Sequence, residues 1–138
     1  MNARNTTVAR VIDGDEPQLH QFVRMQMNSF LKWDLVRFFH ENPQVLALPA
    51  QVAAQTGREQ QLIQPVLEEM AAQGMLRRQP QPGSGESYYG LTTDQAICNL
   101  LDRLFEALND RAFRIKAVYT VIRAQADVLR RPEPIPVA

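Results

Sequence analysis

The stretch that decides the fold is VAAQTGREQQLIQPVLEEMAAQGML, residues 52–76. It predicts the end of a short helix, a tight turn at Gly57 and a longer helix that stops at Gly74, because glycine readily adopts the left-handed conformation that ends helices. The longer helix is expected over residues 58–73, with an inward stripe formed by Leu62, Ile63, Val66, Leu67 and Met70. Pro65 lies inside this helix, where it removes one hydrogen bond and favours a bend.

Two apolar helices are expected before this stretch. The first begins at Asp15 or Glu16, where an acidic cap precedes Pro17. The second covers residues 30–41 and is apolar on most of its surface, so we expect it at the centre of the core. A short extended piece over residues 45–48 then leads into a brief helix over residues 49–55.

A β-hairpin is expected after the quoted stretch. Two strand-like pieces, residues 75–79 and 86–91, flank a loop of proline, glycine and serine. The order helix, short strand, helix, tight turn, helix and hairpin is that of a winged helix-turn-helix. The sequence therefore predicts a mainly helical fold with a small hairpin wing, an N-terminal helical extension and a long C-terminal helix.

The C-terminal region, residues 93–131, carries a heptad-like apolar seam formed by Ile97, Leu101, Leu104, Leu108, Ile115, Val118 and Ile122. An unbroken helix from residue 93 to 129 would be about 55 Å long, too long to be buried against so small a domain. Asn109-Asp110 is the natural place for a bend. The seam needs a partner surface, so we expect a symmetric homodimer, although folding back onto its own domain would cover part of it.

The residues 30–92 resemble the winged helix-turn-helix of bacterial ArsR-, MarR- and PadR-like regulators. The resemblance is carried by residues 52–57, by the helix that ends in Gly74-Met75-Leu76, and by Tyr88-Tyr89-Gly90-Leu91-Thr92. A group of bacterial proteins with this domain and a long C-terminal helix is similar as well. The implied organisation is an N-terminal arm (1–15), a winged domain with its N-terminal helix (16–92), a dimerisation helix (93–131) and an extended tail (132–138).

The resemblance implies a regulator that binds double-stranded DNA as a homodimer. In the family the third helix enters the major groove, and its N-terminal side chains read base edges. The matching outward positions here are Arg58, Gln60, Gln61 and Gln64. Arg77 and Arg78, at the base of the wing, would contact phosphate or an adjacent minor groove.

The charge balance keeps a second hypothesis open. Residues 45–91 hold three basic and four acidic side chains, whereas DNA-binding surfaces usually carry a basic excess. The alternative is a winged helix that serves as a protein–protein or oligomerisation adaptor without DNA contact. Residues 110–131 carry six basic against two acidic side chains, which indicates either a second basic surface or the solvated face of an amphipathic helix.

No other chemistry stands out in the 138 residues. One cysteine, Cys98, and two histidines, His20 and His40, predict neither a disulfide framework nor a metal site, and we expect no cofactor. No phosphate-binding loop or catalytic constellation occurs, so an enzyme is not expected. No apolar run is long enough to span a membrane and no signal peptide is visible, so the expectation is a soluble cytoplasmic protein with an unknown effector.

Overall fold

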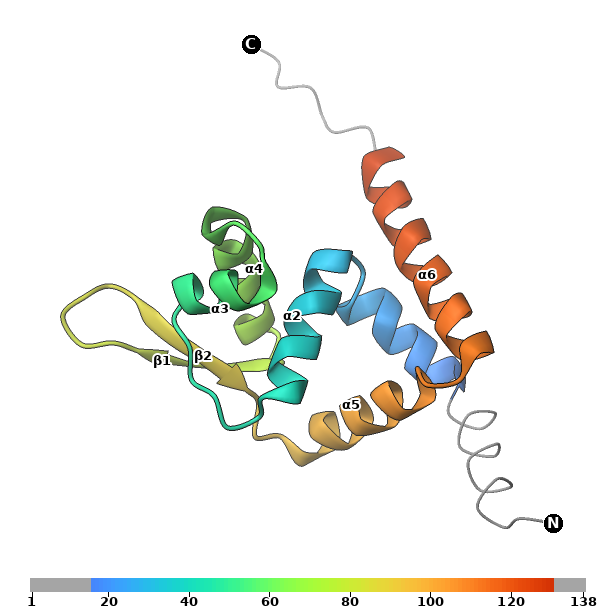
Figure 1. Cartoon of the computed structure of the whole chain (residues 1–138), viewed down its shortest axis with the longest axis horizontal. Coiled ribbons are helices and arrows are strands. Elements are labelled where there is room, and N and C mark those ends of the chain that lie inside the picture. Colours follow the sequence, from blue (N-terminus) through green and yellow to red (C-terminus); the bar gives the residue numbers. More distant parts are fainter. Residues whose placement is uncertain (1–15, 131–138) are drawn as a thin grey trace. The chain divides into compact units, whose positions relative to one another are not determined.

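The computed structural model describes residues 16–130, so the arm and tail expected at residues 1–15 and 132–138 lie outside the described part. A helix over residues 16–26 comes first. It is followed by α2 (Phe30–Glu41), α3 (Pro49–Thr56), α4 (Gln60–Ala72), β1 (Leu76–Pro80), β2 (Ser87–Leu91), α5 (Gln95–Ala107) and α6 (Arg111–Arg130), as Figure 1 shows. The predicted fold class, mainly helical with one small antiparallel hairpin, is confirmed.

The chain forms two compact units. The first spans residues 31–102 and contains α2 to β2 and the first part of α5. The second combines residues 16–30 with the chain from residue 103 onward. The helix over residues 16–26 therefore belongs to the same unit as α6, and the boundary between the units falls inside α5.

The first unit is a winged helix-turn-helix. α3 begins at Pro49, and the Gln51 side chain accepts the backbone N–H of Leu48 at 2.9 Å, which satisfies one free donor at the helix start. Gly57 adopts the left-handed conformation (φ 68°, ψ 26°) and turns the chain towards α4. The core of the unit is formed by Leu35, Val36, Phe39, Val52, Ala53, Ile63, Leu67, Met70, Leu76 and Tyr89.

The wing is fixed to the helices by a third piece of extended chain. Ala47 forms an isolated antiparallel bridge with Tyr89, through backbone hydrogen bonds of 2.9 and 2.8 Å. The neighbouring Gly90 has no room for a side chain, because a Cβ there would lie 2.9 Å from the carbonyl oxygen of Val45. Glycine at this position lets the extended piece approach the hairpin closely.

The C-terminal region is two helices. α5 ends at Ala107 and α6 begins at Arg111, so the break falls at residues 108–110, around the Asn109-Asp110 bend expected from the sequence. The Asp110 carboxylate accepts the backbone N–H of Phe113 at 2.9 Å, which caps the start of α6. A single long helix is therefore not formed. Between residues 16 and 130, no helix combines the length and the apolarity needed to cross a bilayer.

The second unit packs the helix over residues 16–26 against α6 (Figure 1). Its apolar core includes Leu19, Val23, Met27, Leu104, Ala107, Leu108, Phe113, Ala117 and Val121. The His20 ring stacks on Phe113, with 4.5 Å between the ring centroids. At the outer edge, Lys116 Nζ donates to Glu16 Oε1 at 2.8 Å, and this hydrogen bond lowers the pKa of the Glu16 carboxyl.

Candidate nucleic-acid interface

The N-terminal half of α4 presents a cluster of glutamines. Ile63, Leu67 and Met70 are buried, which turns the opposite side of the helix outward. Gln60, Gln61 and Gln64 are all exposed, and together with Glu59 they border one surface hollow of about 480 Å³. The structure therefore brings together three of the residues that sequence reasoning selected as base readers, and we call Gln60, Gln61 and Gln64 the glutamine cluster.

Arg58, the fourth selected residue, is engaged within the protein. Its Nη2 and Nε atoms lie 2.6 and 3.2 Å from Asp34 Oδ2, and its side chain is 35% exposed. This ion pair joins α2 to the turn before α4. Sequence reasoning missed Asp34, because the partners are 24 positions apart and no local pattern links them.

The two wing arginines, Arg77 and Arg78, lie on opposite faces of the hairpin. In β1, Arg77 pairs with Gly90 and Arg78 with Tyr89, and neighbouring strand residues point to opposite faces. Arg77 Nε donates to the carbonyl oxygen of Leu91 at 3.0 Å, and Arg78 Nε donates to Ser87 Oγ at 3.0 Å. Each guanidinium keeps further N–H groups for another acceptor, and both residues are exposed.

The winged unit is acidic overall. Residues 31–102 contain five lysines and arginines and eight aspartates and glutamates, a formal charge of 5 − 8 = −3. Lys32 Nζ lies 3.0 Å from Glu69 Oε1, and Arg37 Nε lies 3.2 Å from Glu41 Oε1. Together with Arg58, three of the five cations therefore have a carboxylate partner, which leaves the wing as the main source of positive charge beside α4.

The residues expected to form the dimer seam fall into two groups in the structure: those at α5 are mostly buried, and those on α6 are mostly exposed. On α5, Leu101 and Leu104 are fully buried and Ile97 is half-buried, and Leu108, directly after α5, is buried as well. On α6, the inward stripe is Phe113, Ala117 and Val121. Ile115 and Ile122 are 45% and 46% exposed, and Val118 is half-buried. The α6 part of the seam is thus free in a single chain, whereas the α5 leucines already serve its core.

The exposed α6 residues continue into a strip. Tyr119, which lies one turn from Ile115 and from Ile122 at helical spacing, is 58% exposed. We call Ile115, Tyr119 and Ile122 the α6 strip. Three large apolar side chains on one helix face, turned outward, are typical of a surface that another protein surface covers.

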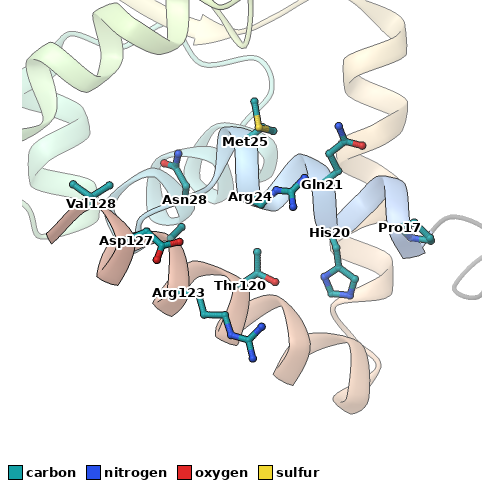
Figure 2. Close-up of a pocket in the computed structure, with 11 residues that line it drawn as sticks. Pro17, His20, Gln21, Arg24, Met25, Asn28, Thr120, Arg123, Asp127 and Val128 are labelled. Carbon is teal, nitrogen blue, oxygen red and sulfur yellow. The ribbon is translucent and has the colours of Figure 1, made fainter. Parts of the chain in front are cut away.

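A groove of about 690 Å³ lies between the helix over residues 16–26 and α6. Figure 2 shows His20 and Arg24 on the first helix and Thr120, Arg123 and Asp127 on α6. Guanidinium groups on both walls can donate to a small organic anion. Every residue of this groove belongs to the second unit.

In the described part of the chain, no group of three or more histidine, cysteine, aspartate and glutamate side chains could hold a metal ion. Cys98 is half-buried, with Sγ 3.3 Å from the carbonyl oxygen of Thr92. This small side chain packs at the start of α5.

Comparison with solved structures supports the same fold. A crystal structure of NadR in complex with 4-hydroxyphenylacetate matches 96% of this chain and 96% of its own chain, with 15% sequence identity and a TM-score of 0.51. A crystal structure of the transcriptional regulator PA3341 matches 92% of this chain and 98% of its own, with 18% identity and a TM-score of 0.46. No family model and no curated protein matches the sequence. At 15% identity, the likeness to NadR supports the winged-helix fold and shows nothing beyond the fold.

Proposed function

We propose that the protein is a transcriptional regulator that binds double-stranded DNA as a homodimer. The observation that carries the proposal is the glutamine cluster, three exposed amides at the N-terminal half of α4 on a winged-helix scaffold. In this fold the N-terminal side chains of the second helix of the motif reach base edges in the major groove. The likeness to NadR over nearly the whole chain supports the same interpretation.

Phosphate contacts are assigned to Arg77 and Arg78. Both are exposed at the base of the wing, and each holds one internal hydrogen bond that fixes its Nε atom. Because they lie on opposite faces of the hairpin, they reach different phosphates or one phosphate and the adjacent minor groove. With only these two cations free of carboxylate partners in the winged unit, each subunit binds weakly, and two subunits are needed for useful affinity.

The dimer is assigned to the second unit, with the α6 strip in its interface. A symmetric dimer places the same strip on both subunits, so that each strip covers apolar surface of the other. Of the other residues of the expected seam, Leu101, Leu104 and Leu108 are buried within each subunit and hold α5 in place, and Ile97 is half-buried. Two copies of α4 then face two half-sites on the DNA.

The test is fluorescence anisotropy with a labelled mixed-sequence duplex of about three helical turns. Arg77→Glu and Arg78→Glu, separately and together, are expected to weaken binding, because each replaces a phosphate donor by a repelled charge. Arg111→Glu, at the exposed start of α6, is the matched control for each single variant, with the same change of net charge. Size-exclusion chromatography confirms that each variant keeps the oligomeric state. Unchanged DNA affinity in the double variant would refute the wing assignment.

One observation favours a second candidate function, an adaptor that binds protein and not DNA. The winged unit has a formal charge of −3, and three of its five cations are paired with carboxylates. An adaptor needs no basic surface. Under this alternative, the folded wild-type protein does not bind duplex DNA even at low salt.

A further inference from the structure

We infer that α4 reads adenine–thymine pairs in the major groove in preference to guanine–cytosine pairs. The inference rests on the proposed function, because it concerns which base pairs the glutamine cluster recognises. Three properties of α4 support the inference. The amides of the glutamine cluster make few contacts within the protein, α4 contains no lysine or arginine that could recognise guanine, and Leu62, at the start of α4, is an exposed apolar side chain.

The amide groups of the glutamine cluster can form paired hydrogen bonds with adenine. In the major groove adenine presents the N7 acceptor and the N6 donor, and a glutamine amide offers one donor and one acceptor at the matching separation. Within residues 16–130 the Gln60 and Gln64 side chains make no hydrogen bond, and Gln61 Nε2 makes one long contact of 3.3 Å to Glu59 Oε2. From the helical repeat, the three side chains fall within about 100° of the helix circumference. They can therefore face one stretch of groove.

α4 lacks the type of side chain that usually recognises guanine. Guanine presents two acceptors, N7 and O6, which arginine or lysine satisfies with two donors. The sequence of α4, Gln60–Ala72, contains no lysine or arginine. The nearest arginine along the chain, Arg58, is turned towards Asp34 at 2.6 Å. A duplex rich in guanine therefore offers acceptors that α4 cannot fully pair.

Leu62 offers thymine an apolar contact. Leu62 is 54% exposed although it is a large apolar residue at the start of α4. Apolar side chains in the major groove contact the C5 methyl group of thymine, which cytosine lacks. A carboxylate can accept the cytosine N4 donor, and Glu59, whose Oε2 accepts the Gln61 amide at 3.3 Å, keeps acceptor capacity for it. The preference for A·T pairs therefore comes from adenine, thymine and guanine, not from rejection of cytosine. Glu68 lies about 12 Å further along the helix from Gln60, at 1.5 Å per residue.

The experiment compares three duplexes of equal length by fluorescence anisotropy with the full chain at low salt. The first contains only A·T pairs, the second only G·C pairs and the third only inosine·C pairs. Inosine·C presents the major groove of G·C and the minor groove of A·T, so it separates the two grooves. We expect A·T to bind at least about tenfold more tightly than both others, because one bidentate base contact is worth about 5- to 150-fold.

Two further measurements test whether the preference for A·T pairs depends on the adenine N7 atom and on the glutamine cluster. Replacing every adenine by 7-deaza-adenine removes the N7 acceptor and is expected to abolish the advantage of the A·T duplex. Gln60→Ala, Gln61→Ala and Gln64→Ala combined in one variant should do the same, and alanine in exposed helix positions favours folding. Gln73→Ala, at the exposed far end of the same helix, is the matched control and should keep the preference.

The outcomes are distinct. Equal, salt-dependent binding to all three duplexes overturns the inference and leaves the proposed DNA binding in place. Equal binding to A·T and inosine·C, both tighter than G·C, places the preference in the minor groove and also overturns it. Absence of binding to any duplex at low salt, with a folded protein, overturns both the inference and the proposed function.

Discussion

Replacing Asp34 by asparagine should strengthen DNA binding. Asp34 Oδ2 holds two nitrogens of the Arg58 guanidinium, at 2.6 and 3.2 Å, immediately before α4. Asparagine keeps the shape of the side chain but loses the charge, so the guanidinium is released beside the glutamine cluster. The formal charge of the winged unit rises from −3 to −2.

The size of the effect follows from counterion release. One additional phosphate contact changes the slope of log K against log salt by about −0.9, which corresponds to about eightfold tighter binding at 0.1 M salt for each subunit. The cost in folding stability is small, because the two side chains are 35% and 40% exposed, and exposed ion pairs are worth about 0–1 kcal/mol.

The assay is a salt titration of duplex binding by fluorescence anisotropy, with urea denaturation to measure stability. Asp102→Asn is the matched control: it removes one acidic charge from the same unit at a residue 70% exposed, where the partner is His40. A steeper slope in Asp34→Asn than in Asp102→Asn supports the reasoning. Equal slopes in the two variants would show that the released Arg58 does not reach a phosphate, and the reasoning would be refuted.

Three further predictions concern the scaffold. Gly90→Ala should lower the free energy of unfolding by about 1–3 kcal/mol in urea denaturation, because the new Cβ would lie 2.9 Å from a backbone carbonyl oxygen; wild-type stability would show that the extended piece can move aside. Ile122→Lys should shift the protein from dimer to monomer in analytical ultracentrifugation without unfolding it, whereas Ala112→Lys, also exposed on α6, should not; a dimer in both would exclude the α6 strip from the interface. Since Lys116 lowers the pKa of Glu16, the ionised carboxylate stabilises the fold at pH above its ordinary pKa of 4.5, and this contribution is lost as the pH falls through the lowered pKa. Lys116→Met should therefore flatten the loss of stability on the acid side in urea denaturation at a series of pH values, and an unchanged pH profile would contradict the pairing.

The elements of the winged unit could be predicted from the sequence because each has a local signal. Gly57 ends α3 in the left-handed conformation, and the glycine-rich loop between β1 and β2 marks the hairpin. The exposed face of α4 followed only in part: Ile63, Leu67 and Met70 are buried as expected, but the expectation that Leu62 points inward is wrong, because its side chain is 54% exposed. The exposed Pro65 does not interrupt α4, which runs from Gln60 to Ala72 around it.

Other features could not be predicted because they depend on contacts between distant segments. The Arg58–Asp34 ion pair joins residues that share no sequence pattern. On α6, two apolar stripes lie side by side, one through Phe113 and Val121 and one through Ile115 and Ile122. The heptad-like spacing identified the stripe through Ile115 and Ile122 but not the one through Phe113 and Val121, which is the stripe buried within the second unit.

The most direct test of DNA binding is the salt dependence of wild-type binding to a mixed-sequence duplex, measured by fluorescence anisotropy. With Arg77 and Arg78 as phosphate donors, a monomer makes two such contacts and a dimer makes four. The account therefore predicts binding at 50 mM salt that weakens as salt rises, with a slope of log K against log salt between about −2 and −4. A folded protein that does not bind at 50 mM salt, or that binds without salt dependence, would contradict it.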